Sequence, residues 1–174
     1  MMDAMHQEIQ NLFIEGVNEV FYTLFNDGEN EGVYFFPQVE QEKNVYQEEK
    51  GKVYGNPALL VSRVQLNPVQ GEENIQTIRC DALFTVPYMS LRDRGIDVSE
   101  NNLVNLRKGL MKYKDTYYTI ENIKPHAFVE QTFLLYDFIC KEQIFSDLDE
   151  IEFLFTEEFD ESADISTEEE EDEQ

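Results

Sequence analysis

Residues 75–87 alternate between apolar and polar side chains more regularly than any other part of the chain. The apolar positions of this segment are Ile78, Cys80, Ala82, Phe84 and Val86. Because successive side chains of a strand point to opposite faces, all five lie on one face. Pro87 ends the pattern, since proline cannot donate a hydrogen bond to a neighbouring strand. The segment predicts a strand in a sheet that is buried on one face, so partner strands are required elsewhere.

Further segments supply such partners. They are residues 33–36, which end at Pro37; residues 58–66, which precede the turn Asn67-Pro68; a hairpin of residues 110–113 and 116–123 across Lys114-Asp115; and residues 129–140. A further turn is expected at Lys124-Pro125. Residues 129–140 are largely apolar on both faces, which favours a strand in the centre of a sheet or at an interface.

The first 25 residues have a helical period instead. Their apolar side chains recur at the i, i+3, i+4 and i+7 intervals of one helical face. These side chains are Met5, Ile9, Leu12, Phe13, Val17, Val20, Phe21, Leu24 and Phe25. Asp3 is the expected N-cap, and Asn26-Asp27-Gly28 is the expected stop. Gly16 inside the helix either allows the close approach of another backbone or is neutral.

Shorter elements complete the pattern. One helical turn is expected from Ser90, its cap, to Gly95, its end. Residues 99–106 are a short helix or a loop, and residues 146–159 are a helix capped by Ser146 or a strand that pairs with a neighbour. The whole pattern predicts an α+β fold, in which an N-terminal amphipathic helix packs on a mainly antiparallel sheet or on a small open β-barrel.

The charge of the chain is concentrated at one end. The formal net charge is −24, and residues 142–174 contain 16 acidic residues and no Lys or Arg. Residues 1–141 are therefore expected to form a mildly acidic folded domain, and residues 142–174 an acidic extension that is disordered from about residue 160. This charge argues against binding to nucleic-acid phosphates and to anionic membranes.

The sequence lacks the signatures of several classes of protein. No signal peptide and no apolar run of membrane-spanning length is visible. Neither His6 nor His126, which is expected in a turn, has a partner at metal-ligand spacing, and no phosphate loop or nucleophile elbow occurs. Cys80 and Cys140 are expected to be buried thiols rather than a disulfide. We therefore expect no enzyme, no catalytic residues, no cofactor and no metal.

One cluster of charge is a candidate for partner binding. Six of the 13 basic residues lie within a short stretch, and they are Arg92, Arg94, Arg107, Lys108, Lys112 and Lys114. This basic set is either a solvated face with ion pairs to Asp93, Asp97 and Asp115 or a patch that docks an acidic surface. Another copy of the chain offers an acidic surface, and head-to-tail contact between unlike patches closes into rings when the rotation permits.

Three stretches resemble the small neck proteins of tailed bacteriophages, the head-closure or head-to-tail connector group. They are NPALLVSRVQLNP, CDALFTVPYMSLRDRGIDVSENNL and LRKGLMKYKDTYYTIENIKPHAFVEQTFLLYDFICKEQ, about 75 of the 174 residues. The acidic extension beyond Glu142 and the amphipathic N-terminal helix lie outside this resemblance. The helix is similar to tail-terminator proteins, so the place of the chain along the neck stays open.

The resemblance implies a structural virion protein, assembled in the host cytoplasm as a ring of six or twelve copies between head and tail. Its partners would be further copies, the portal or adaptor, and tail proteins, and DNA would pass through the ring without specific binding. Part of the negative charge would then face the DNA channel and repel phosphates. Two other classes stay open: an acidic DNA-mimic inhibitor, and an acidic adaptor whose extension contacts basic partners.

Overall fold

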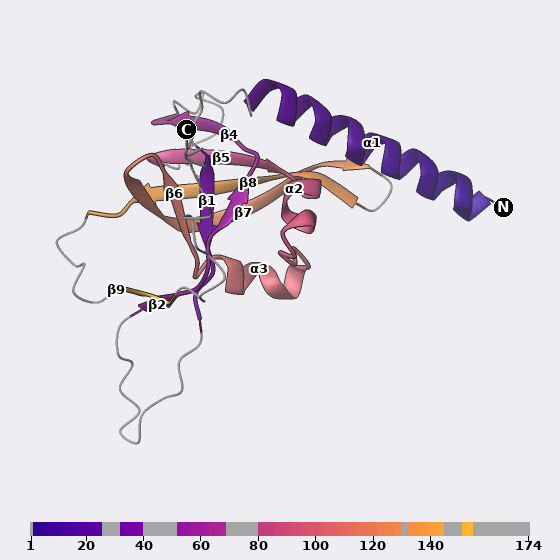
Figure 1. The fold of residues 1–174 in the computed structure, drawn as a ribbon. Coiled ribbons are helices and arrows are strands. Elements are labelled where there is room, and N and C mark those ends of the chain that lie inside the picture. Colours follow the sequence, from indigo (N-terminus) through magenta and orange to yellow (C-terminus); the bar gives the residue numbers. More distant parts are fainter. Residues whose placement is uncertain are drawn as a thin grey trace, which may run out of the picture.

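A computed structural model describes residues 2–25, 32–39, 52–68, 80–129, 132–144 and 151–154. An N-terminal helix packs against a seven-stranded antiparallel open sheet, and two short helices follow the fifth strand (Figure 1). The elements are α1 (Met2–Phe25), β1 (Val33–Phe36), β2 (Lys52–Tyr54), β3 (Ala58–Leu60), β4 (Arg63–Leu66), β5 (Ala82–Pro87), α2 (Tyr88–Asp93), α3 (Glu100–Leu106), β6 (Leu110–Tyr113), β7 (Thr116–Val129), β8 (Thr132–Glu142) and β9 (Ile151–Phe153). The predicted α+β fold is confirmed.

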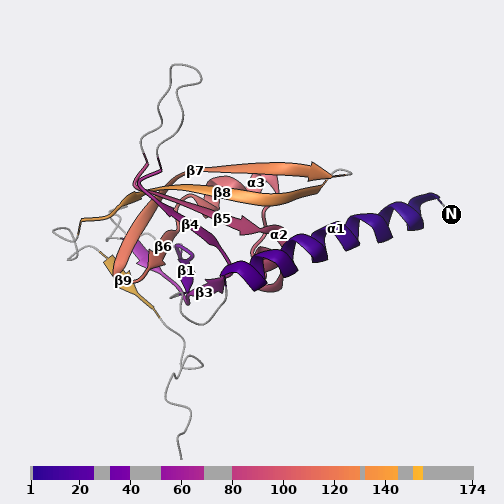
Figure 2. The same cartoon turned by 90° about the horizontal axis from the view of Figure 1, so that it is seen from above.

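The sheet is curled, and its two edge strands follow each other directly in the sequence. The strand order is β3-β1-β6-β7-β8-β5-β4, so β3 and β4 are the two edge strands. Only Val61 and Ser62 separate them along the chain. Four consecutive Cα atoms span at most about 11 Å, so the opposite edges of the sheet are held close together. The strand predicted over residues 58–66 therefore exists as two halves, one on each edge (Figure 2).

The core lies on the face of the sheet that the short helices cover. On β5 and β8 the cross-strand pairs Ala82–Cys140, Phe84–Phe138 and Val86–Tyr136 all point to this face. Leu91 of α2 and Leu106 of α3 are buried in the same cluster. The predicted alternation is therefore confirmed over β5, where Ala82, Phe84 and Val86 are completely inaccessible to solvent. Residues 75–79 of the predicted strand, with Ile78, lie outside the described residues.

A smaller cluster lies on the other face of the sheet. Phe36 and Leu110 alternate with core residues of β1 and β6, so they point away from the main core. Tyr54 of β2 and Phe153 of β9 pack over them, and β2 pairs with β9 in parallel. Residues 151–153 of the acidic extension thus form a strand on this domain. The structure also describes residues 142–144 and 154 of this extension, and its other residues, with the region predicted to be disordered, lie outside the described residues.

Three local predictions are wrong. Asp3 is not the N-cap of the first helix, because α1 already begins at Met2. Ser90 does not cap α2, because the helix begins at Tyr88 after Pro87, and the Ser90 hydroxyl instead accepts a hydrogen bond from the Val61 N–H at 3.0 Å. Lys124-Pro125 is not a turn, because β7 continues to Val129 and these residues pair with β8. β6 stops pairing with β7 at Thr119, so one side of β7 is an edge at Pro125, and a proline is tolerated there.

Other local predictions hold. The hairpin across Lys114-Asp115 has the expected arms, and Gly95 follows α2 with a φ of +70°, which favours glycine. Cys80 and Cys140 are buried free thiols. The expected stop of the first helix lies outside the described residues, but α1 ends at Phe25, just before it.

Candidate functional site

The basic set is divided among three elements of the fold. Arg92 and Arg94 lie at the end of α2, Arg107 and Lys108 follow α3, and Lys112 and Lys114 belong to β6 and its turn. Arg92 has an exposed ion pair with its neighbour Asp93 at 3.7 Å. The structure thus supports one of the three local ion pairs that the sequence suggested.

The other members of the basic set contact different parts of the sheet. The Arg94 Nε donates to the carbonyl of Leu59 on β3 at 3.1 Å, and the Arg107 Nη2 donates to Asn122 Oδ1 on β7 at 2.7 Å. The Lys112 Nζ lies 5.4 Å from the ring centroid of Tyr117. These positions run from one edge of the sheet to its centre. The basic set therefore lies on three elements with separate local contacts, and its role in partner binding stays a prediction.

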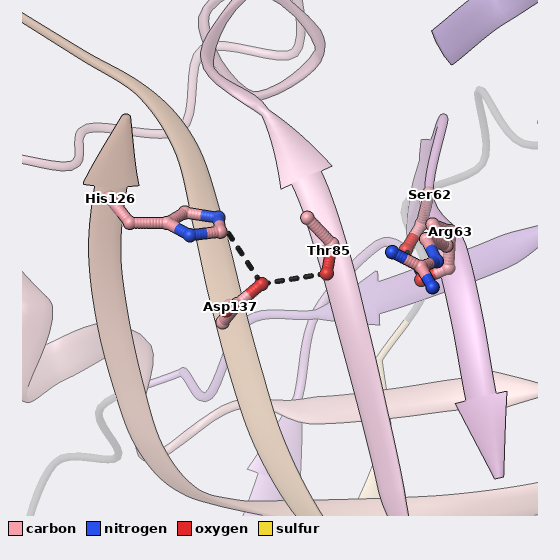
Figure 3. Close-up of polar contacts among 5 residues, drawn as sticks. All are labelled: Ser62, Arg63, Thr85, His126 and Asp137. Atoms are coloured by element: carbon pink, nitrogen blue, oxygen red, sulfur yellow. Dashed lines mark hydrogen bonds and ion pairs between the residues drawn. The ribbon is translucent and has the colours of Figure 1, made fainter. Parts of the chain in front are cut away.

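A polar cluster crosses the outer face of the sheet between β7, β8 and β5 (Figure 3). The Thr85 hydroxyl donates to Asp137 Oδ1 at 2.6 Å, and His126 Nε2 lies 3.5 Å from the same oxygen. Arg63 on β4 is opposite Thr85 in the register. His126 was expected in a turn, so the sequence did not bring these residues together.

This cluster does not have the order that nucleophilic catalysis requires. In a Ser-His-Asp relay the imidazole lies between the hydroxyl and the carboxylate. Here the carboxylate lies between the other two groups, and Thr85 is only 7% exposed. The arrangement instead ties three adjacent strands together and satisfies the hydroxyl of a buried threonine.

The cavities lie between elements and have mixed linings. One of about 460 Å³ lies where α1 ends, between β1 and the β3–β4 junction, with Tyr22, Tyr34 and Arg94 in its wall. Another of about 620 Å³ lies between the α2–α3 connection and the start of β8. In the part of the chain that the structure describes, no group of three or more His, Cys, Asp or Glu side chains could hold a metal ion. No described helix has the length and apolarity needed to cross a membrane.

The most unusual surface of the molecule is on α1. The helix packs against α2, β5 and β8, and the Gln10 side-chain amide donates to the Thr132 hydroxyl at the start of β8. Ile14 is the only buried side chain of α1 among residues 4–25. In Figures 1 and 2 the N-terminal turns of α1 project beyond the sheet.

A second apolar stripe of α1 faces solvent, and we call it the outer face of α1. Its large side chains are each more than half exposed, and they are Met5, Leu12, Phe13, Val20 and Leu24. A helix in a monomeric protein normally turns its apolar stripe to the core and its polar side to water. Contiguous exposed apolar surface on a protein usually marks an interaction site. The outer face of α1 is therefore the candidate functional site.

The sequence predicted the helix but not this surface. All nine apolar residues were assigned to one face, whereas the structure turns part of them outward and buries Ile14, which was not among them. One feature of the sequence could have indicated this surface. The apolar residues of α1 span a wider arc of the helix than one sheet can cover. No protein-family model matches this sequence, and no curated protein is similar to it.

Proposed function

We propose that this protein is a structural component of the neck of tailed bacteriophages, which assembles into a ring between head and tail. The observation that carries the proposal is the outer face of α1, because its exposed apolar side chains require an assembly partner. The class of protein is inferred from a resemblance to phage neck proteins, which covers residues 56–68, 80–103 and 106–143. The curled sheet would be the rigid body of each subunit.

The edges of the sheet favour assembly through the helix. The two edge strands β3 and β4 have only three and four residues, and both are anchored at their common junction. Short edge strands offer little backbone for pairing with another chain, and the side of β7 that β6 leaves unpaired after Thr119 contains Pro125, which has no N–H to donate. Contact between subunits would therefore depend on side chains of α1 more than on pairing between strand edges.

The distribution of charge fits a protein that surrounds DNA without binding it. The described residues contain 13 acidic and 10 basic residues, so their charges nearly balance. Most of the net charge of −24 belongs to the rest of the chain, chiefly the acidic extension. A DNA mimic would instead display its carboxylates across the folded surface. The extension would be the part that keeps phosphates away from the ring.

The test is direct observation of the assembly. The purified full-length chain is concentrated and imaged by negative-stain electron microscopy, and its mass is measured by light scattering. We expect rings, binding to portal or tail particles of the phage that encodes the chain, and no retention of duplex DNA in a gel. A chain that stays monomeric at high concentration and binds neither particle would refute the proposal.

A further inference from the structure

The outer face of α1 contains a gap at its centre. Gly16 lies on this face, one turn after Leu12 and one turn before Val20. A Cβ atom placed on Gly16 would meet nothing within 4 Å. Glycine inside a helix is less stable than alanine, and no contact within the described molecule requires it. The gap lets the surface of a partner approach the α1 backbone closely.

The surroundings of the outer face are acidic. Glu8, Glu15 and Glu19 are exposed along one side of it, and α1 contains no Lys or Arg. This charge disfavours several occupants. A second α1 would bring like charges together, an anionic membrane would be repelled, and residues 155–174 of the chain contain 11 acidic residues and no basic one. The partner that fits has an exposed apolar side chain beside cations.

The chain itself presents such a surface on α3. Val104 is 61% exposed, and Arg107 and Lys108 follow it at i+3 and i+4, so all three lie on one side of the helix end. Arg107 is held by its hydrogen bond to Asn122. We call Val104, Arg107 and Lys108 the α3 surface. It combines an apolar side chain of moderate size with two positive charges from the basic set.

We propose that the outer face of α1 docks on the α3 surface of a second copy of this chain. Val104 enters the gap at Gly16, and Arg107 and Lys108 lie beside Glu15 and Glu19. In Figure 1, α2 lies between α1 and α3, so the two helices that present these surfaces are separated within one molecule. Each copy then offers one surface to the copy before it and the other to the copy after it. Such head-to-tail contacts generate rings or filaments.

This proposal rests on the proposed function, since it names the contact that joins neighbours in the ring. The test uses two charge-reversed full-length variants, Glu15→Lys with Glu19→Lys, and Arg107→Glu with Lys108→Glu. Sedimentation equilibrium measures the self-association of each variant and of an equal mixture. Each variant alone brings like charges together, and we expect about tenfold weaker association than in the unmodified chain. The mixture restores opposite charges at every contact and should associate like the unmodified chain.

Matched controls keep the same change in net charge at other exposed positions. They are Glu121→Lys with Glu142→Lys for the first variant, and Lys52→Glu with Lys124→Glu for the second. We expect both controls to associate normally. Gly16→Leu, which fills the gap with a residue that favours helix, should also weaken association by about tenfold or more. Circular dichroism and the thermal midpoint establish that every variant is folded.

The outcomes separate this proposal from the proposed function. If the unmodified chain is monomeric at all concentrations, the proposed function fails and this contact fails with it. If the chain associates and the Glu15→Lys, Glu19→Lys variant associates equally well, the ring has another interface and only this proposal is wrong. Tighter association of that variant would show that Glu15 and Glu19 do not lie beside cations of the neighbouring copy and would also overturn it. Failure of the mixture to recover would show that these two surfaces do not pair.

Discussion

Two glycines of this chain have opposite surroundings. A Cβ atom on Gly109 would lie 2.9 Å from the carbonyl oxygen of Phe36 and would overlap the ring of Phe35, which is only 3% exposed. Neither the strand backbone nor a buried ring can move away easily. We expect Gly109→Ala to lower the free energy of unfolding by about 1–3 kcal/mol, as overpacking of a core does. Urea unfolding followed by circular dichroism measures the change.

Gly16 provides the matched comparison. A Cβ atom there meets open space, and the residue lies inside a helix. At a concentration where the chain is monomeric, Gly16→Ala should raise the free energy of unfolding by up to about 1 kcal/mol, because alanine favours the helix. If Gly16→Ala destabilised the monomer as Gly109→Ala does, the surroundings of the two glycines would not explain their effects.

Among the elements, α2 and the β3–β4 junction are linked by one hydrogen bond. The Ser90 hydroxyl, 7% exposed, accepts from the N–H of Val61, which lies between the two edge strands. Ser90→Ala leaves this N–H without its acceptor, so we expect a loss of about 1–2 kcal/mol in the free energy of unfolding. Ser99→Ala is the control, because the Ser99 hydroxyl is exposed and bonds only to nearby Asp97. An equal loss in both variants would contradict the assigned role of Ser90.

The elements that the sequence predicted well are those that depend on near neighbours. The β6–β7 hairpin follows from its turn residues, and α1 follows from its period. The split of residues 58–66 into β3 and β4 depends on pairing with β1 on one side and β5 on the other, which a local pattern does not contain. Pro125 likewise signals a turn unless the strand beside it is known to have ended.

For the candidate site, too, the sequence predicted local features but not the contacts between distant residues. Arg92, Arg107 and Lys112 are close in sequence, but they belong to three elements with separate contacts in the sheet. The outer face of α1 depends on which apolar side chains the sheet leaves uncovered. Periodicity alone could indicate that the apolar arc is too wide, but it could not indicate that Ile14 faces inward and Leu12 outward.

For the whole molecule, stability should fall at alkaline pH. Burial raises the pKa of the Cys140 thiol far above its ordinary value of 9.0, and it raises the pKa values of Tyr118 and Tyr136 above 10.0. These groups stay protonated in the folded chain and ionise more readily once it unfolds. The folded state binds more protons in this range, so stability is complete below about pH 9 and decreases as the pH rises further.

The thermal midpoint between pH 6 and pH 11 measures this decrease. We expect a plateau to about pH 9 and then a steady fall. Cys140→Ala should have a smaller decrease between pH 9 and pH 10 than the unmodified chain, because it lacks the thiol with the largest shift. A midpoint that rises above pH 9 would show that other groups dominate the alkaline range.

The junction between β3 and β4 also determines how the chain can fold. β1 pairs with β3 and β4 pairs with β5, while β3 and β4 do not pair with each other, and β6, β7 and β8 form a run of neighbours. This run meets the other strands where β1 pairs with β6 and where β5 pairs with β8, and both pairings join residues far apart in sequence. Closing long loops costs more entropy than closing short ones, so we expect the β6–β7–β8 neighbours to pair before these two long-range pairings form. Because only Val61 and Ser62 connect β3 to β4, forming one long-range pairing brings the strands of the other close together, and we expect the sheet to fold as one cooperative unit.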